Sequence, residues 1–185
     1  MRLYLFVIGV GMLVISAVNI AFGTAPFYDV IGAVVFCTAM QFALDGLIAI
    51  AINKMPDGWF GVDNPLYRVS DRERRMYQWL NVKKWKDSVW ELGGLGGFSK
   101  RRLTDPTNPA YIERFIVECN KGVLTHRLSY PVGFLVMLAL PWPTSLTIAL
   151  PVALVNLYLN ILPTLVLRYN TPMLHILLKR LKRRV

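Results

Sequence analysis

Two apolar runs near the start of the chain are long enough to cross a membrane. The first, residues 3 to 22, contains no charged residue. A helix of this length, rising about 1.5 Å per residue, spans the roughly 30 Å hydrocarbon core of a bilayer. The second run, residues 30 to 52, includes Gln41 and Asp45. Because a carboxylate is costly in hydrocarbon, we expect these two side chains, one turn apart, to face the inside of a helix bundle.

A third apolar stretch, residues 128 to 167, is uncharged over a length that fits two crossings better than one. The sequence "PWPT" at residues 141 to 144 places two prolines in its middle, where proline favours a turn over a continuing helix. We therefore predict two further crossings, at about 124 to 140 and 145 to 167.

Three polar or helix-breaking features mark the last of these crossings. Asn156 and Asn160 are four residues apart and share a helix face. Pro163 deprives the carbonyl of Leu159 of its helical partner, which predicts a kink beside the two amides. After residue 167 the sequence "PMLHILLKRLKRRV" is typical of a basic amphipathic helix on a membrane surface.

The polar segment between the second and third crossings, residues 54 to 123, ends in a predicted helix. Asn108 is suited to cap this helix, and Pro109 follows at its first position. Glu118 and His126 are eight residues apart with a glycine midway between them. This spacing places both on nearly one face as the helix enters the bilayer, with open space between the acid and the imidazole.

Aromatic and basic residues alternate in the same segment, a mixture suited to the headgroup layer of a membrane. The glycine-rich sequence "GGLGGFSKRR" at residues 93 to 102 permits a close backbone approach. A phosphate or sugar could rest there beside Lys100, Arg101 or Arg102, although a flexible surface loop is an equally good interpretation. Four of the five tryptophans lie in this segment: Trp59, Trp79, Trp85 and Trp90.

Charge placement supports four crossings. The chain is 55% hydrophobic with a mean hydropathy of +0.43, yet its net charge is +10. All 21 Lys and Arg residues fall at Arg2, in residues 54 to 127 or after residue 167. Basic residues near membrane ends stay in the cytoplasm, so both termini and the large segment are expected there. Nucleic-acid binding is disfavoured because the basic residues flank apolar spans.

The sequence thus predicts an all-α polytopic membrane protein with four transmembrane helices, a large cytoplasmic segment that lies on the membrane and a C-terminal amphipathic helix. A cleaved signal peptide is disfavoured because the first run exceeds the usual apolar core of about 7 to 15 residues. The predicted organisation has four parts: a transmembrane hairpin at 1–53, an interfacial segment at 54–123, a second hairpin at 124–167 and a basic tail at 168–185.

Cysteine and histidine usage does not indicate a metal site. His126 and His175 are 49 residues apart and have no nearby cluster of carboxylates in the sequence. Cys37 and Cys119 have no metal-binding spacing. Cys119 follows Glu118 and could form an acyl thioester, but a free cysteine on an apolar stripe is more often a small buried side chain.

Three blocks of the chain resemble a known family. These are "VKKWKDSVWELGGLGGFSKRRL", "YIERFIVECNKGVLTHRL" and "NILPTLVLRYNTP". They are similar to the glycosyl-diaponeurosporenoate acyltransferase family, small bacterial membrane proteins of the staphyloxanthin pathway, over roughly residues 75 to 172. The family pattern falls on the following positions of this chain: Trp85, Lys86, Asp87, Lys100, Arg101, Glu118, His126, Asn160, Arg168, Tyr169 and Asn170.

The resemblance implies transfer of a fatty acyl group from a donor to a hydroxyl of a lipid-linked acceptor, glycosylated or isoprenoid, at the bacterial cytoplasmic membrane. A hydroxyl is a poor nucleophile near neutral pH, and histidine has a pKa suited to a base there. We expect His126 to be the general base and Glu118 to orient its imidazole. No cofactor is expected, and membrane lipids, donor and acceptor are the partners. The expected substrate contacts are Trp85, Lys86, Lys100, Arg101, Arg102, Asn160, Arg168, Tyr169 and Asn170.

Two other classes of function stay open at this stage. One is a different membrane enzyme, such as a reductase acting on an isoprenoid or sterol-like lipid, which could use the same histidine and polar helix face. The other is a non-catalytic lipid-binding subunit, in which His126 would contact only headgroups or a neighbouring side chain. The sequence leaves the donor, the acceptor, the acyl length and the oligomeric state undetermined.

Overall fold

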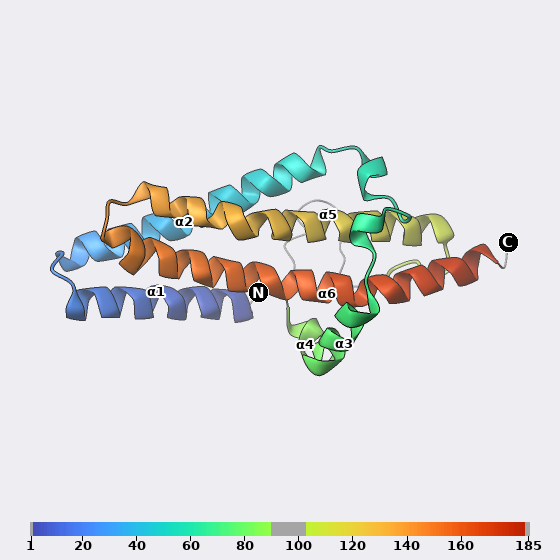
Figure 1. The fold of residues 1–185 in the computed structure, drawn as a ribbon, viewed down its shortest axis with the longest axis horizontal. Helices are drawn as coiled ribbons and strands as arrows, with labels where there is room; N and C mark the ends of the chain where they lie inside the picture. Colours follow the sequence, from blue (N-terminus) through green and yellow to red (C-terminus); the bar gives the residue numbers. More distant parts are fainter. Residues whose placement is uncertain (1, 90–102, 184–185) are drawn as a thin grey trace. The chain divides into compact units, whose positions relative to one another are not determined.

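The computed structural model describes residues 2–89 and 103–183, and within these ranges the chain forms helices and turns with no strand (Figure 1). This confirms the predicted all-α class. The elements in chain order are α1 (Arg2–Phe22), α2 (Phe27–Asn53), the 3-10 helices η1 (Asp57–Phe60) and η2 (Pro65–Tyr67), α3 (Asp71–Trp79), α4 (Val82–Trp85), the 3-10 helix η3 (Lys86–Ser88), α5 (Pro109–Gly133), the 3-10 helix η5 (Phe134–Ala139), the π-helix η6 (Ser145–Ala149) and α6 (Leu150–Lys182).

Three stretches in the described part of the chain are long and apolar enough to cross a membrane: Leu3–Phe22, Phe27–Asn53 and Ser145–Lys182. The first two match the predicted first hairpin. The predicted third crossing, 124 to 140, is instead divided between the end of α5 and η5. Because α5 begins at Pro109 and carries several charged residues in its first half, the whole helix is not apolar enough to count as a fourth candidate.

The last helix is longer than predicted, because α6 continues to Lys182 through both Pro163 and Pro172. The tail after residue 167 is therefore the end of α6 and not a separate amphipathic helix. Proline within a membrane helix is tolerated where the carbonyl that it frees finds another donor. Here the Tyr4 hydroxyl, from α1, donates to the carbonyl oxygen of Leu159 at 3.1 Å.

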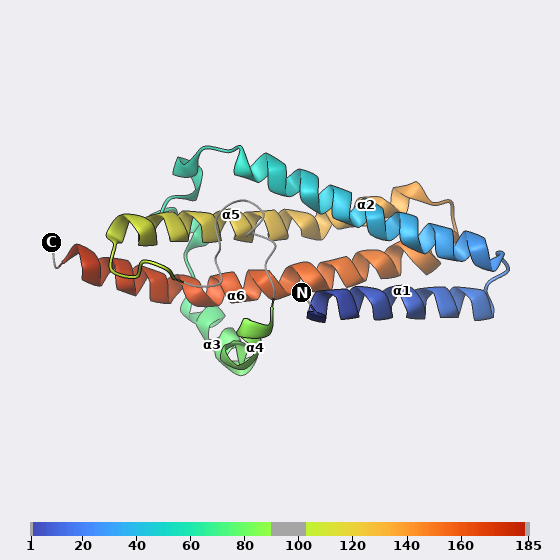
Figure 2. The same ribbon diagram turned by 180° about the vertical axis from the view of Figure 1, so that it is seen from behind.

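The chain divides into two compact units. The first unit contains residues 1–49 and 126–161. Within it, α1 runs alongside the beginning of α6, as the two views in Figures 1 and 2 show. A Cβ added at Gly11 would lie 3.2 Å from Val155 Cγ2, so these helices approach closely. The apolar core of this unit is formed by Ile15, Val30, Val34, Cys37, Val136, Ile148, Ala149, Val152 and Ala153.

The outer faces of α1 and α2 carry large apolar side chains that nothing in their unit covers. Phe6 is 67% exposed, Leu13 69% and Leu47 64%. A water-soluble protein rarely exposes such a continuous apolar surface. These faces are therefore suited to contact lipid, as expected for helices that cross a membrane.

The second unit contains residues 50–125 and 162–185. Its short helices are fixed by local caps and by side chains from α5. Ser70 and Glu73 form a reciprocal capping box at the start of α3. From α5, Asn120 donates to the carbonyl oxygen of Phe60 at 2.9 Å, and Lys121 pairs with Asp57. The segment after α2 is thus a folded element of this unit.

Candidate functional site

Five polar side chains of the first unit meet inside an otherwise apolar bundle, and we call them the polar cluster. Gln41 and Asp45 come from α2, His126 from α5, and Asn156 and Asn160 from α6. Gln41 and Asn160 are buried, and the other three are partly buried. The cluster confirms that Asp45 and Gln41 face polar partners on other helices.

His126 is held in this cluster by an amide. Its Nδ1 lies 2.8 Å from Oδ1 of Asn160. The amide nitrogen of Asn160 in turn donates to Oδ2 of Asp45 at 3.1 Å. A carboxylate and an imidazole from two different helices are therefore joined through one asparagine of a third helix.

A second part of the cluster runs from Asn156 to the backbone of α5. Asn156 Nδ2 donates to Gln41 Oε1 at 3.0 Å, and Gln41 Nε2 donates to the carbonyl oxygen of Gly133 at 2.7 Å. A Cβ added at Gly133 would lie 3.1 Å from Asn156 Nδ2 and 3.2 Å from Gln41 Oε1. A larger residue at this position would therefore require Gln41 or Asn156 to shift by a few tenths of an ångström.

Glu118, the predicted partner of His126, belongs to the second unit. Its carboxylate lies 3.9 Å from the ammonium of Lys121, one turn later on α5. The Lys121 side chain is only 9% exposed and also pairs with Asp57 and faces the ring of Phe60, 5.7 Å from its centroid. Two carboxylates thus neutralise one buried cation, and an orienting role of Glu118 toward His126 stays a prediction.

Arg168, a predicted substrate contact, is buried in the second unit against α3. Its Nε and Nη2 donate to the two carboxylate oxygens of Glu73, the latter at 2.7 Å, and Nη2 also donates to the carbonyl oxygen of Arg68 at 3.1 Å. Tyr77 donates to Glu73 at 2.5 Å, and its ring lies edge to face with that of Tyr169 at 6.3 Å. Among the described residues, Nη1 of Arg168 has no hydrogen-bond partner.

The pKa values of this cluster follow from its geometry. Burial alone would raise the pKa of Glu73, but hydrogen bonds from Arg168 and Tyr77 outweigh burial and lower the pKa to about 2. Burial, and then the nearby Glu73 carboxylate, raise the pKa of Tyr77. The pair of Glu73 and Arg168 is therefore fully charged at neutral pH, and Tyr77 keeps its proton.

The other predicted contacts in the described part of the chain lie in the second unit. In the second unit, Trp85 donates to the carbonyl oxygen of Leu80 at 3.0 Å, and Lys86 pairs with Asp87 at 2.8 Å. Tyr169 and Asn170 lie on α6 next to Arg168, and both are partly buried. The remaining predicted cations of the glycine-rich sequence lie outside the described residues: Lys100, Arg101 and Arg102.

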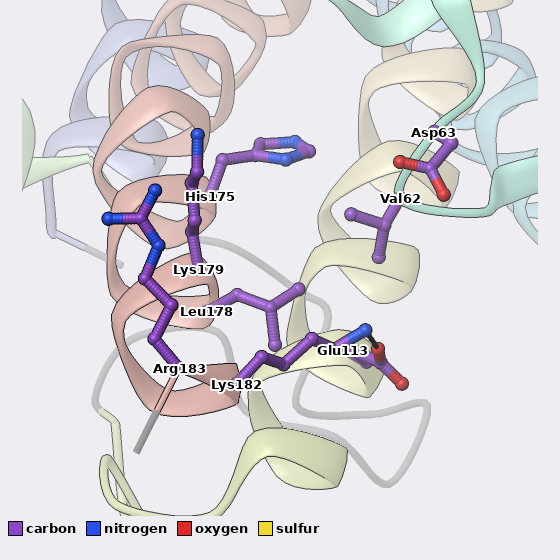
Figure 3. A pocket seen from close by; sticks show the side chains of 8 residues that line it. All are labelled: Val62, Asp63, Glu113, His175, Leu178, Lys179, Lys182 and Arg183. Atoms are coloured by element: carbon purple, nitrogen blue, oxygen red, sulfur yellow. Dashed lines mark ion pairs between the residues drawn. The ribbon is translucent and has the colours of Figure 1, made fainter. Parts of the chain in front are cut away.

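His175 lines a cavity of about 420 Å³ at the end of α6 in the second unit. Figure 3 shows its ring pointing across the cavity toward Asp63 and Val62, while Lys182 meets Glu113. Charges of both signs line this cavity, with Asp63 and Glu113 beside Lys179, Lys182 and Arg183. In the described part of the chain, no group of three or more His, Cys, Asp or Glu side chains is placed to hold a metal ion.

Several residues that make important contacts in the structure were not predicted from the sequence. Glu73 carries a visible signal, since "SDRE" at residues 70 to 73 is a capping-box pattern, but this pattern predicts a helix start and not an ion pair. Asp57 and Lys121 carried no local signal. The role of Gly133 depends on side chains that are distant in sequence.

These observations define the chain as an all-helical protein with three candidate membrane-spanning helices and a histidine in a polar cluster of its apolar unit. The model of the glycosyl-4,4'-diaponeurosporenoate acyltransferase family matches residues 56–180, which is most of the chain. The chain therefore belongs to this family. No curated protein and no solved structure is significantly similar to it. The matched segment includes His126 and Asn160 but not Gln41 or Asp45.

Proposed function

We propose that the protein is an integral membrane acyltransferase that moves a fatty acyl group to a hydroxyl of a lipid-linked, glycosylated acceptor, with His126 as general base. The observation that carries this proposal is the 2.8 Å contact between His126 Nδ1 and Asn160 Oδ1, made within the family-matched segment. An imidazole whose one nitrogen is fixed presents its other nitrogen in a defined direction, as a positioned base requires.

The chemistry that this arrangement supports is direct transfer. His126 accepts the proton of the acceptor hydroxyl while the hydroxyl oxygen bonds to the acyl carbonyl carbon of the donor. The bond between that carbon and the leaving atom of the donor then breaks, and the imidazolium returns its proton to the leaving group. His126 is partly buried, and we propose that the substrate reaches its ring at a site from which most water is excluded.

Recognition of the substrates is proposed for polar residues of the second unit. Arg168 is held by Glu73 through Nε and Nη2, which leaves the buried Nη1 as a donor for an anionic or hydroxyl group. The further residues proposed to contact donor or acceptor are Trp85, Lys86, Lys100, Arg101, Arg102, Tyr169 and Asn170. Glu118 stays a proposed partner of His126, since it lies on the same helix two turns earlier.

For the topology we propose four crossings of the bacterial cytoplasmic membrane, in which the end of α5 and η5 form the third. The support is that residues 128 to 140 carry no charge and that Val136 of η5 belongs to the apolar core of the first unit. The position of all 21 Lys and Arg residues supports cytoplasmic termini and a cytoplasmic segment 54–123. Tags at the C-terminus and in this segment should be accessible only from the cytoplasm, and periplasmic labelling of either would contradict the topology.

Substitution of His126 tests the function. In membranes supplied with glycosyl-4,4'-diaponeurosporenoate and fatty acyl donors, the wild-type chain should yield a product heavier by one acyl chain. His126→Ala and His126→Gln should lower this rate by roughly 10²- to 10⁴-fold, the range expected for loss of a general base. His175→Gln is the matched control and should keep the rate.

Expression level and thermal stability in detergent should be retained in all three variants. Full activity of both His126 variants would refute the role of this histidine. A lipid profile that is unchanged by the wild-type protein itself would refute acyl transfer.

A further inference from the structure

The amide of Asn160 has two chemically different ends and stands between two groups with different requirements. Its Nδ2 faces Oδ2 of Asp45 at 3.1 Å, and its Oδ1 faces Nδ1 of His126 at 2.8 Å. An amide nitrogen only donates and an amide oxygen only accepts. Whatever fixes the orientation of this amide therefore also fixes which nitrogen of His126 carries a proton.

We infer that Asp45, acting through Asn160, sets the tautomer of His126 and is a positioning residue of the proposed active site. An ionised carboxylate is an acceptor only, so Asp45 requires the nitrogen end of the Asn160 amide. The oxygen end must then face His126. Because this oxygen only accepts, Nδ1 of the ring must carry the hydrogen, and the lone pair lies on Nε2.

The other end of the polar cluster favours the same orientation. The carbonyl oxygen of Gly133 is an acceptor only, so Gln41 must donate to it through Nε2, at 2.7 Å. The oxygen of Gln41 then accepts from Asn156 Nδ2 at 3.0 Å, which leaves the Asn156 oxygen as an acceptor for Asn160 Nδ2 at 3.2 Å. Asn160 Nδ2 also donates to the backbone carbonyl oxygen of Asn156 at 3.0 Å, so Asp45 and Asn156 together favour this orientation of the amide.

The contacts of Asp45 are those of a group that accepts hydrogen bonds. Both carboxylate oxygens face amide donors: Oδ2 faces Asn160, and Oδ1 faces Asn156 at 3.5 Å. A protonated Asp45 could instead donate to an Asn160 amide turned by half a rotation. The turned amide would then donate to Nδ1 of His126 and move the ring hydrogen to Nε2. The hydrogen-bond role of Asp45 therefore decides whether Nε2 of His126 has a lone pair, and can accept a proton, or already carries a hydrogen.

This inference goes beyond what family membership indicates, because Asp45 and Gln41 lie before residue 56, where the matched segment begins. It rests on the proposed function only for its effect on the reaction rate. The tautomer itself is a property of the folded chain and needs no substrate.

The decisive experiment is nitrogen NMR of the full chain in detergent or lipid, with its imidazole nitrogens labelled. The chain has two histidines, so His175→Gln leaves one imidazole, that of His126. At a pH where the ring is neutral, we expect a protonated Nδ1 and an unprotonated Nε2, although free histidine favours the opposite tautomer. A ring with its proton on Nε2 would overturn the inference without any further variant.

Substitution of Asp45 tests whether its carboxylate is the cause of the His126 tautomer. Asp45→Asn keeps the size of the side chain but adds a donor, so the ratio of the Nδ1–H to the Nε2–H form should fall by about fivefold or more, the effect of losing one hydrogen-bond preference. Asp45→Glu keeps an acceptor-only group and should retain the Nδ1–H form. Asp29→Asn removes an equal charge from the exposed first turn of α2 and is the matched control. An unchanged ratio in a folded Asp45→Asn protein would refute the role of Asp45.

The rate measurement separates this inference from the proposed function. If the enzyme acts as proposed, Asp45→Asn should lower kcat with little change in KM, because it alters the base and not the substrate contacts. If Asp45→Asn shifts the tautomer but the wild-type protein transfers no acyl group, the proposed function is refuted and the inference is not. An active wild-type enzyme whose Asp45→Asn variant keeps both tautomer and kcat would sink the inference alone.

Discussion

Replacement of Glu73 by Gln tests how much the second unit depends on one ion pair. Glu73 accepts from two nitrogens of Arg168, whose side chain is 5% exposed, and from the hydroxyl of Tyr77. It also occupies the third position of α3, where it completes the capping box with Ser70. Gln supports a capping box as well as Glu does, so Glu73→Gln removes the charge while keeping the helix start.

The expected loss follows from the burial of the pair. Removing one partner of a buried ion pair costs about 3–5 kcal/mol, because the other charge is left buried without compensation. Gln keeps one acceptor oxygen for the guanidinium, and the Glu73 side chain is 21% exposed, so solvent screens part of the effect. We therefore expect the lower end of this range, a loss of about 3 kcal/mol in the free energy of unfolding.

Reversible unfolding in mixed detergent micelles, followed by far-UV circular dichroism, measures this loss. Asp71→Asn is the matched control, because it removes the same charge from the same turn of α3. Its partner is the exposed Arg74, 3.6 Å away, with side-chain exposures of 52% for Arg74 and 85% for Asp71. This control should change stability by under about 1 kcal/mol.

A double variant supplies the outcome that refutes the reasoning. If the cost arises from an uncompensated buried charge, adding Arg168→Met to Glu73→Gln should restore part of the stability, because no charge is left to bury. Equal losses in Glu73→Gln and Asp71→Asn, or strictly additive losses in the double variant, would show that the ion pair is energetically equivalent to a surface pair.

Two further predictions concern the acid range and the packing of the polar cluster. The pKa of Glu73 is lowered from its ordinary value to about 2, so its contribution to stability is present at neutral pH. This contribution should fall as the pH drops from about 4.5 toward 2. Acid titration of the Glu73→Gln variant should lack this loss of stability. Gly133→Ala places a methyl group 3.1 Å from Asn156 and 3.2 Å from Gln41, so it should cost about 1–3 kcal/mol and slow acyl transfer. Gly46→Ala, where an added Cβ meets no atom within 4 Å, is the control for the same unfolding and transfer assays; equal effects of the two substitutions would contradict this account.

The helices could be predicted from the sequence to the extent that local patterns determine them. Long apolar runs identified the spans at α1 and α2, and the prolines at 141 and 143 correctly marked a break before α6. The predicted end at residue 167 was wrong because the charged residues that begin at Arg168 were read as the end of the helix, whereas α6 continues to Lys182. A donor from α1 satisfies the carbonyl that Pro163 frees, and no local pattern carries that information.

The sequence predicted two pairs of residues in the candidate site, but not that the pairs meet. Helical spacing placed Gln41 with Asp45 and Asn156 with Asn160, but the meeting of the two pairs depends on the packing of segments more than 100 residues apart. The pairing of Arg168 with Glu73 has the same cause, since these residues are 95 positions apart. A buried arginine requires an acid, and any of several acidic residues in the chain could have supplied it.

The partners of Asp45 also determine when α2 becomes stable during synthesis. Asn156 and Asn160 follow Asp45 by 111 and 115 residues. At about 5–20 residues per second, the ribosome reaches Asn156 roughly 6–22 s after it has made Asp45. If α2 crosses the membrane as proposed, the carboxylate opposes its insertion during this interval by about 2.5–3.5 kcal/mol, and the apolar remainder of this 27-residue helix must hold it there. His126 is synthesised before Asn156 and Asn160. The polar cluster is therefore complete only after α6 has been made, and α6 supplies the last polar partners of α2.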